Sequence, residues 1–288
     1  MDAELSSYAI AAKAALATVA PEPGAPKPDP ILVADSVRRT FGGITAVDVD
    51  HSEVQRGSIT ALIGPNGAGK TTFFNLLTGF DKPTTGAWSF DGAPMDDIAA
   101  HRTAQLGMVR TFQLTKSLTK MSVIDNMKLG ATDQRGEKWW NGLLPFLWRD
   151  QEAEIEARAD ELLQRFKLHH MRNEYAGTLS GGQRKLLEMS RALMTKPKLV
   201  MLDEPMAGVN PALKQSLNQH IKGLRDDGMT VLFVEHDMDM VHDISDWVIV
   251  MAEGRVIAEG TPDQISQNPA VIDAYLGAHQ GKSLLEDL

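Results

Sequence analysis

Residues 64–71 read Gly-Pro-Asn-Gly-Ala-Gly-Lys-Thr, a glycine-rich turn that ends in a lysine and a hydroxyl residue. The turn follows an apolar run, Ser58–Ile63, and precedes a helical pattern over Thr71–Thr78. A turn of this composition between a strand and a helix is typical of a phosphate-binding loop, whose backbone N–H groups surround one anion. The helix N-terminus adds partial positive charge. We therefore expect Lys70 to reach the β- and γ-phosphates of a nucleotide, and the Thr71 hydroxyl to ligate Mg²⁺.

Apolar runs elsewhere in the chain predict a sheet around this loop. The runs are bounded by turn residues and lie at Ile31–Ala34, Leu199–Leu202, Val231–Val234 and Trp247–Met251. Continuous apolar runs fit strands covered on both faces, as in a mainly parallel sheet flanked by helices. Between them, Glu152–Lys167 and Arg184–Met194 carry apolar residues on one helical face. Glu253 and Gly254 predict a hairpin turn. The fold class is therefore expected to be α/β.

The run Leu199–Leu202 ends in two carboxylates, Asp203 and Glu204. A strand of a parallel sheet delivers its last residues to the carboxyl edge, where nucleotides bind. Asp203 is expected to hold the Mg²⁺ shell, and Glu204 to polarise an attacking water near the γ-phosphate. The alternative is a solvated turn, which the neighbouring phosphate-binding loop makes the weaker interpretation.

Residues 179–183 read Leu-Ser-Gly-Gly-Gln and predict a second anion-binding helix start, capped by Ser180. One nucleotide has no need of two such sites within one chain. At this point the chain resembles the ATP-binding subunits of ABC transporters, whose signature sequence this is. The resemblance implies a head-to-tail dimer, in which the signature of one subunit closes over ATP held by the other.

The remaining motifs of that family follow in order. The resemblance implies that Phe41 stacks on adenine, that Gln113 reaches Mg²⁺ and the attacking water and senses a membrane subunit, and that His236 contacts the γ-phosphate. It assigns nucleotide binding to Phe41, Gly64, Pro65, Asn66, Gly67, Ala68, Gly69, Lys70, Thr71, Thr72, Ser180, Gly181, Gly182 and Gln183, metal binding to Thr71, Gln113 and Asp203, and catalysis to Glu204, His236 and Gln113. Asn210 stands where the family more often has aspartate, which leaves its role across the dimer open.

Four stretches resemble the ATPases of branched-chain (hydrophobic) amino-acid importers within this family. They are Val-Arg-Thr-Phe-Gln at 109–113, Ala-Gly-Val-Asn-Pro at 207–211, Glu-His-Asp-Met at 235–238 and Val-Ile-Asp-Ala-Tyr-Leu-Gly at 271–277. The first three also occur in sister groups such as lipopolysaccharide-export ATPases. The resemblance implies a peripheral subunit on the cytoplasmic side of the cell membrane, which hydrolyses ATP to drive solute import.

The same resemblance implies several partners. These are a second ATPase subunit, identical or different, integral membrane permeases and, indirectly, a solute-binding protein. The alternatives are a lipid or lipopolysaccharide export ATPase and a soluble ABC ATPase outside transport.

Composition sets the outer limits of these predictions. The chain has 288 residues, 29 Lys and Arg against 38 Asp and Glu, a net charge of −9 and no cysteine. An acidic chain is a poor nucleic-acid binder, and without cysteine neither disulfides nor thiolate sites can form. Apolar runs of 18 or more residues, long enough to span a membrane, do not occur in the sequence.

We expect three parts along the chain. Residues 1–30, rich in alanine and then proline, predict a weakly helical or disordered tail. Residues 31–277 predict the ATPase domain, an α/β fold with a P-loop NTPase core and a helical subdomain inserted at about 114–185. A small antiparallel β layer is expected to flank the core at its N-terminal end, and residues 278–288 are expected to form a C-terminal tail. Three of the five tryptophans lie in 139–148, which predicts either a patch for a partner or packing within the subdomain.

Overall fold

The structure is a computed structural model that describes residues 6–95, 98–111, 118–132 and 149–283. Its centre is a six-stranded sheet in the order β10-β9-β3-β8-β7-β6. The strands are β3 (Ile59–Ile63), β6 (Met108–Thr111), β7 (Leu199–Asp203), β8 (Thr230–Val234), β9 (Trp247–Ala252) and β10 (Arg255–Gly260). All pairs are parallel except the β9–β10 hairpin, which turns at Glu253 and Gly254. Every residue of β3, β7 and β8 is buried, which confirms the expectation drawn from the apolar runs.

A second, four-stranded sheet is antiparallel and has the order β2-β1-β4-β5. Its strands are β1 (Pro30–Phe41), β2 (Ile44–Gln55), β4 (Thr85–Phe90) and β5 (Ala93–Pro94). The run Ile31–Ala34 lies here and not in the parallel sheet, because its partners are β2 and β4. The helix α2 (Lys70–Leu77) follows the phosphate-binding loop. Its Phe73, Phe74, Leu76 and Leu77 belong to the core shared by the two sheets.

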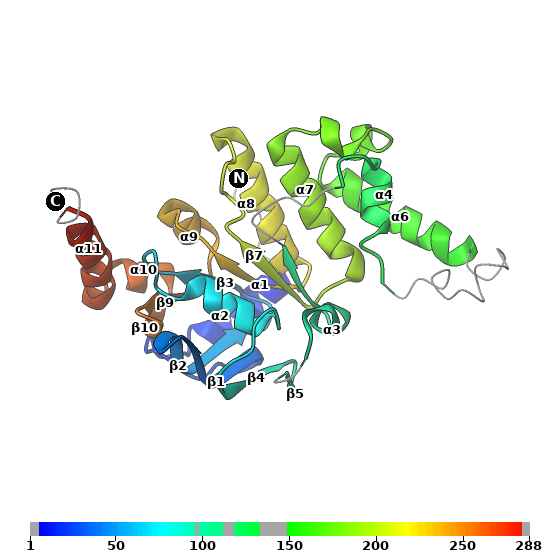
Figure 1. Cartoon of the computed structure of the whole chain (residues 1–288). Helices are drawn as coiled ribbons and strands as arrows, with labels where there is room; N and C mark the ends of the chain where they lie inside the picture. Colours follow the sequence, from blue (N-terminus) through cyan, green and yellow to red (C-terminus); the bar gives the residue numbers. More distant parts are fainter. Residues whose placement is uncertain (1–5, 96–97, 112–117, 133–148, 284–288) are drawn as a thin grey trace.

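Further helices cover the central sheet or lie at its ends (Figure 1). They are α3 (Ala100–Gln105), α4 (Val123–Lys128), α6 (Arg149–Arg165), α7 (Gly181–Ala192), α8 (Pro211–Asp226), α9 (Met238–Ile244), α10 (Pro262–Ser266) and α11 (Pro269–Ser283). Short 3-10 turns occur at His169–Met171, Ala176–Thr178 and Leu193–Thr195. Helices α4, α6 and α7 contact one another and gather at the end of the molecule opposite α11. They form the inserted helical subdomain. Together with the mainly parallel central sheet and the antiparallel sheet beside it, they confirm the expected α/β fold class.

Helix α11 continues past residue 277 to Ser283, so the first residues of the expected C-terminal tail are helical. Asn268 accepts a hydrogen bond from the N–H of Ala270 at the start of this helix. Among the described residues, none of the helices is long and apolar enough to cross a membrane.

The N-terminal stretch, expected to be a weakly helical or disordered tail, is helical in part and ordered over residues 6–30. Residues Ser7–Leu16 form α1, which packs against α8 through a face that buries Ala9, Ala12 and Leu16. The proline-rich stretch then crosses to the edge of the central sheet. There Lys27 Nζ lies 2.5 Å from Glu259 Oε2, and both side chains are fully buried. A local composition rule misses this order because the acid that pairs with Lys27 lies 232 residues away.

Candidate functional site

The phosphate-binding loop lies against two strands that come from distant parts of the sequence. A Cβ atom on Gly64 would lie 2.0 Å from the carbonyl oxygen of Met251, and one on Gly69 would lie 2.4 Å from that of Ala46. Both glycines also have positive φ, at 149° and 93°. Only glycine permits this backbone path at so close an approach. At these two glycines the loop therefore passes close to the backbones of β9 and β2.

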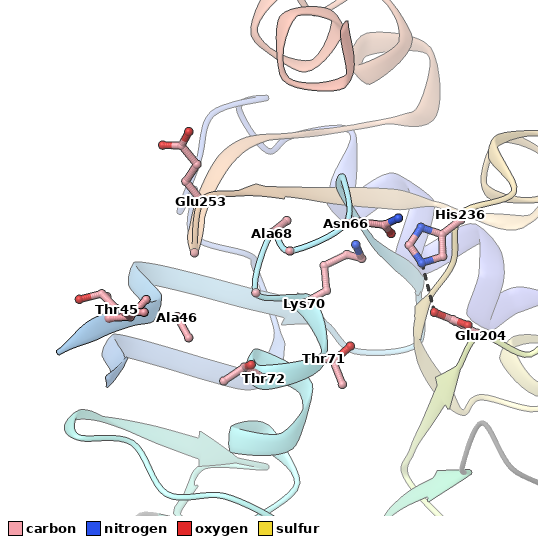
Figure 2. A pocket seen from close by; sticks show the side chains of 14 residues that line it. Thr45, Ala46, Asn66, Ala68, Lys70, Thr71, Thr72, Glu204, His236 and Glu253 are labelled. Carbon is pink, nitrogen blue, oxygen red and sulfur yellow. Dashed lines mark hydrogen bonds and ion pairs between the residues drawn. The ribbon is translucent and has the colours of Figure 1, made fainter. Parts of the chain in front are cut away.

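The loop borders an open cavity of about 490 Å³, shown in Figure 2. Its lining consists of Ile44, Thr45, Ala46, Asn66, Gly67, Ala68, Gly69, Lys70, Thr71, Thr72, Glu204, His236, Glu253 and Gly254. The cavity brings together loop residues, the predicted general base and the predicted γ-phosphate histidine. Glu253 and Thr45 lie on the other side of the loop from the Glu204–His236 pair in Figure 2.

The ammonium group of Lys70 is folded back over the loop that precedes it. Its Nζ atom donates to the carbonyls of Gly64, at 2.7 Å, and Pro65, at 2.9 Å. Burial lowers the pKa of Lys70, and the charge of Glu204 opposes this shift. The loop therefore holds a desolvated cation at the place where a nucleotide's anionic phosphates are expected to bind.

Glu204 follows the last residue of β7 in a left-handed conformation, with φ at 46°. Its N–H donates to the carbonyl of Val234 at 3.0 Å, which extends the β7–β8 pairing by one residue. Its Oε1 atom lies 3.1 Å from Nε2 of His236. Non-glycine residues with positive φ are uncommon and cluster at functional sites, where surrounding contacts hold them in place.

Two residues for which no role was predicted from the sequence, one buried and one half-buried, hold this corner. Glu235 accepts hydrogen bonds from the N–H of Met206, at 2.7 Å, and from the N–H of His236, at 3.1 Å. It thereby ties the loop after Glu204 to the residue that carries the histidine. The available signal for Glu235 in the sequence was a carboxylate directly after the apolar run Val231–Val234.

The second is Lys185 of α7, which donates to the carbonyls of Glu204 at 3.4 Å, Pro205 at 3.0 Å and Ala207. Burial lowers the pKa of Lys185. Its contacts link the helix that begins at the signature segment to the loop after Glu204.

The cavity wall opposite the histidine was not predicted. Ile44, Thr45 and Ala46 come from the start of β2, and Glu253 and Gly254 form the β9–β10 hairpin. The hairpin was expected from sequence, but its place beside the phosphate-binding loop depends on sheet order. The N–H of Gly254 donates to the carbonyl of Ala68 at 3.0 Å, which fixes that place.

Phe41 is placed outside the cavity lining. It ends β1, is 47% exposed, and the guanidinium of Arg39 lies 4.5 Å from its ring centre. The exposed Ile44 lines the cavity nearby. Stacking of Phe41 on adenine therefore stays a prediction. Gln113, the Trp-rich stretch 139–148 and residues 112–117 lie outside the described residues.

The signature segment starts α7 and does not line the cavity of its own chain. Ser180 accepts from the N–H of Gln183 at 3.2 Å, and the Gln183 side chain accepts from the N–H of Ser180 at 2.9 Å. This reciprocal cap fulfils the expectation that Ser180 caps the helix. Asn210 caps α8 by a single hydrogen bond, since its side chain accepts from the N–H of Leu213 at 2.9 Å.

Asp203 ends β7 beside α2. Its Oδ2 atom accepts a hydrogen bond from Arg110 Nη2 at 2.6 Å, and Arg110 Nη1 donates to Asn75 of α2 at 2.6 Å. The Asp203 carboxylate and the Thr71 hydroxyl are oxygen donors of the kind that Mg²⁺ prefers. Among the described residues, no group of three or more His, Cys, Asp or Glu could hold a metal ion. The Asp203 carboxylate and the Thr71 hydroxyl nevertheless suit Mg²⁺, because this ion usually takes one or two protein ligands and completes its shell with phosphate oxygens and water.

Comparison with known proteins adds two family matches. Residues 48–207 match the ABC transporter family model, and residues 255–280 match the model described as branched-chain amino acid ATP-binding cassette transporter. The first match contains the loop at 64–71, the signature and Glu204, and the second begins in β10.

Similar proteins extend over nearly their full length. A probable branched-chain amino acid transport ATP-binding protein, LivG, of Archaeoglobus fulgidus is 40% identical over 252 residues, covering 88% of this chain and 97% of that protein. The high-affinity branched-chain amino acid transport ATP-binding protein BraF of Pseudomonas aeruginosa is 40% identical over 250 residues, covering 86% and 98%.

Solved structures agree with these matches. The ADP conformation of an ATP-binding cassette of an ABC transporter superposes with a TM-score of 0.75 at 37% identity, covering 86% of this chain and 99% of that one. CbiO1 of Clostridium perfringens, part of an ABC transporter complex, gives a TM-score of 0.72 at 28% identity and covers 90% and 99%. With the loop, the Glu204–His236 pair and the signature helix in place, the chain belongs to the ATP-binding subunits of ABC transporters.

Proposed function

We propose that this chain hydrolyses ATP to drive the import of branched-chain amino acids, or related small polar solutes, through separate membrane permeases. The observation that carries the proposal is the match of residues 255–280 to the branched-chain amino acid family model, on a chain 40% identical to LivG and BraF. Membership of the ABC family makes the chain an ATPase. The solute is the finer part of the proposal, because solutes bind to other subunits. Export of lipids and ATPase roles outside transport are not favoured by these relatives.

The phosphate-binding loop would hold the β- and γ-phosphates of ATP. Its backbone N–H groups and the N-terminus of α2 supply partial positive charge, and Lys70 supplies a full one. Lys70 is at present held by two loop carbonyls, so it can exchange these for phosphate oxygens with a small movement. We infer that Phe41, Gly64, Pro65, Asn66, Gly67, Ala68, Gly69 and Thr72 complete the nucleotide site, as the family motif implies.

Glu204 is proposed as the general base and His236 as the group that contacts the γ-phosphate. An ionised carboxylate only accepts hydrogen bonds, so Nε2 of His236 carries a proton when the two are bonded. The same N–H can turn to a phosphate oxygen while Glu204 takes up a water. Catalysis then rests on positioning and on stabilisation of charge around the γ-phosphate.

Mg²⁺ is proposed to bind to Thr71, Asp203 and Gln113. When bound, it would neutralise charge on the β- and γ-phosphates. A hydrogen bond from Arg110 holds the Asp203 carboxylate in place. Thr71 lines the same cavity as Lys70.

A second ATPase subunit is proposed to complete the site. Ser180, Gly181, Gly182 and Gln183 lie at a helix start outside the chain's own cavity, which supports a role on ATP held by another subunit. The Ser180 Oγ atom accepts the capping hydrogen bond from the N–H of Gln183, so its own hydroxyl hydrogen can be donated to a phosphate oxygen. The second subunit is identical or a related ATPase, and the pair would lie against permease subunits on the cytoplasmic side of the membrane.

The assignment of the solute is tested by purifying the chain together with its membrane permeases and reconstituting the complex in lipid vesicles. ATP hydrolysis is then measured with binding proteins loaded with leucine, isoleucine, valine, urea or short amides. Stimulation by one or more of the three branched amino acids, and absence of stimulation by empty binding proteins, is the expected result. Stimulation by urea or amides alone would contradict the amino-acid assignment while leaving the ATPase role intact.

A further inference from the structure

The buried arginine Arg110 has a place in the site that the motifs do not assign. It lies in β6, in register with Met201 of β7, and its side chain is 7% exposed. One branch of its guanidinium donates to Asp203 Oδ2 at 2.6 Å. The other donates to Asn75 Oδ1 at 2.6 Å and to Thr78 Oγ1 at 3.3 Å, both near the C-terminal end of α2. Arg110 therefore joins the helix of the phosphate-binding loop to the acid at the end of β7.

The guanidinium is held from its faces as well as its edges. Its central carbon lies 5.1 Å from the centre of the Phe74 ring and 5.6 Å from that of Phe80. Phe74 is fully buried in the core. Because stacking and hydrogen bonds both restrain it, the arginine is a fixed reference for the carboxylate it touches.

Asp203 is itself nearly buried, with 9% of its side chain exposed. A charge-assisted hydrogen bond to Oδ2 restricts rotation of the carboxylate and directs Oδ1 to other ligands. Mg²⁺ needs near-ideal octahedral geometry at about 2.1 Å, so its affinity depends on how well such oxygens are oriented. The same cation also repels Mg²⁺, so the two effects of Arg110 on the metal have opposite signs.

We propose that Arg110 is a positioning residue, which orients the Asp203 carboxylate for Mg²⁺ so that its ordering effect exceeds its repulsion. The inference rests on the proposal that Asp203 takes part in binding the metal. Asn75 supports Arg110 from the opposite side and is expected to act in the same direction, more weakly.

The test compares ATP affinity with and without Mg²⁺, by titration of a fluorescent ATP analogue and competition with ATP. In Arg110→Met the gain in affinity that Mg²⁺ gives should fall at least fivefold, while ATP affinity in EDTA stays within twofold of wild type. Arg110→Lys should recover part of the gain, and Asn75→Ala should lose a smaller part. The Mg²⁺ concentration for half-maximal ATP hydrolysis should rise most in Arg110→Met and less in Arg110→Lys and Asn75→Ala.

Arg225→Met is the matched control for loss of a buried ion pair. Arg225 lies 2.8 Å from Asp246, with 4% and 1% of the side chains exposed, and neither residue lines the nucleotide cavity. This variant should lower the melting temperature without changing the Mg²⁺ dependence.

Asp203→Asn separates the two proposals. If it leaves the Mg²⁺ gain unchanged, the metal role of Asp203 is wrong. If it removes the gain while Arg110→Met and Arg110→Lys both keep it, only the role of Arg110 is wrong. Tighter Mg²⁺ binding in Arg110→Met would also overturn the inference, because repulsion would then dominate. If Arg110→Met does not fold, the ratio of ATP affinity with Mg²⁺ to ATP affinity in EDTA is compared in Arg110→Lys and Asn75→Ala. An unchanged ratio in both variants would overturn the role of Arg110.

Discussion

The Nε2 atom of His236 lies 3.1 Å from Oε1 of Glu204, across the carboxyl ends of β8 and β7. The two residues come from neighbouring strands of the central sheet, and both line the cavity beside the phosphate-binding loop. Buried Glu235 holds the backbone on both sides of the pair. The side chains therefore meet through strand order and not through sequence proximity.

Replacement of His236 by alanine should remove the contact to the γ-phosphate and the partner of Glu204. We expect kcat for ATP hydrolysis to fall by at least about 100-fold, the usual scale for removal of one preorganised hydrogen-bond donor to developing charge. ATP affinity should stay within about threefold, because the loop and Lys70 are unchanged. Equilibrium binding and steady-state hydrolysis check both values. His242→Ala, which alters an exposed pair with Asp263, is the control and should keep kcat. A loss of affinity equal to the loss of kcat would contradict this role.

Replacement of Lys70 by methionine should weaken ATP binding but stabilise the chain without nucleotide. Burial lowers the pKa of Lys70, so folding at neutral pH carries the cost of a desolvated cation. That cost is fully present below the folded pKa and is lost as pH rises towards the unfolded value near 10.5. The melting temperature of Lys70→Met should exceed that of wild type by about 2 °C at pH 7.

The gain should shrink as the pH rises towards 10, and calorimetry over this range measures it. Lys222→Met, at a half-exposed pair with Asp243, should show no comparable pH-dependent gain. An equal melting temperature of Lys70→Met and wild type at every pH would argue against the desolvated state of Lys70.

Replacement of Ser180 by arginine should abolish hydrolysis in the assembled transporter while the single chain still binds ATP. The bulky cation would occupy the contact to the second subunit's nucleotide, which lies outside the chain's own cavity. Loss of a helix cap costs about 1 kcal/mol in stability.

Ser122→Ala removes a similar cap, since Ser122 accepts from the N–H of Asp125 at 3.1 Å. It serves as the control and should retain hydrolysis. Normal turnover in Ser180→Arg would refute the role of the signature across the dimer.

Replacement of Lys27 by methionine should destabilise the chain by about 3–5 kcal/mol, since it leaves Glu259 buried without its cation. Trp247 also donates to Glu259, at 3.1 Å, and cannot replace the lost charge. Chemical unfolding measures the change, and ATP affinity should stay the same because the pair lies away from the cavity lining.

Arg56→Met is the control, because it breaks two more exposed pairs, one with Asp29 of the N-terminal stretch and one with Asp91, at a cost of about 1 kcal/mol or less each. Equal stability of Lys27→Met and Arg56→Met would mean that the buried pair stabilises the chain no more than exposed pairs do, and would contradict the prediction.

The parts of the fold that local patterns describe could be predicted from the sequence. Runs such as Val231–Val234 and the turn at Glu253 and Gly254 determine their own structure, and the glycine-rich loop requires a strand before it and a helix after it. The pairing of Ile31–Ala34 with β2 and β4 could not be predicted, because an apolar run does not specify its neighbours.

The same limit applies to the site. Motif residues such as Lys70 and Glu204 could be named from spacing. Arg110 contacts Asp203, Glu235 contacts Met206 and Lys185 contacts Pro205, and each contact joins residues that are distant in the sequence. These contacts therefore could not be predicted without the arrangement of the strands. The order of the N-terminal stretch depends likewise on distant parts of the chain, since α1 packs against α8 and Lys27 pairs with Glu259.

The most direct test of the proposed ATPase site is the behaviour of Glu204→Gln with ATP and Mg²⁺. The amide keeps the shape of the side chain but cannot take a proton from water. Light scattering and analysis of the bound nucleotide after gel filtration measure the outcome. The proposed mechanism predicts an ATP-dependent dimer that retains unhydrolysed ATP, with single-turnover hydrolysis reduced at least about 100-fold. A monomer that hydrolyses ATP at nearly the wild-type rate would contradict it.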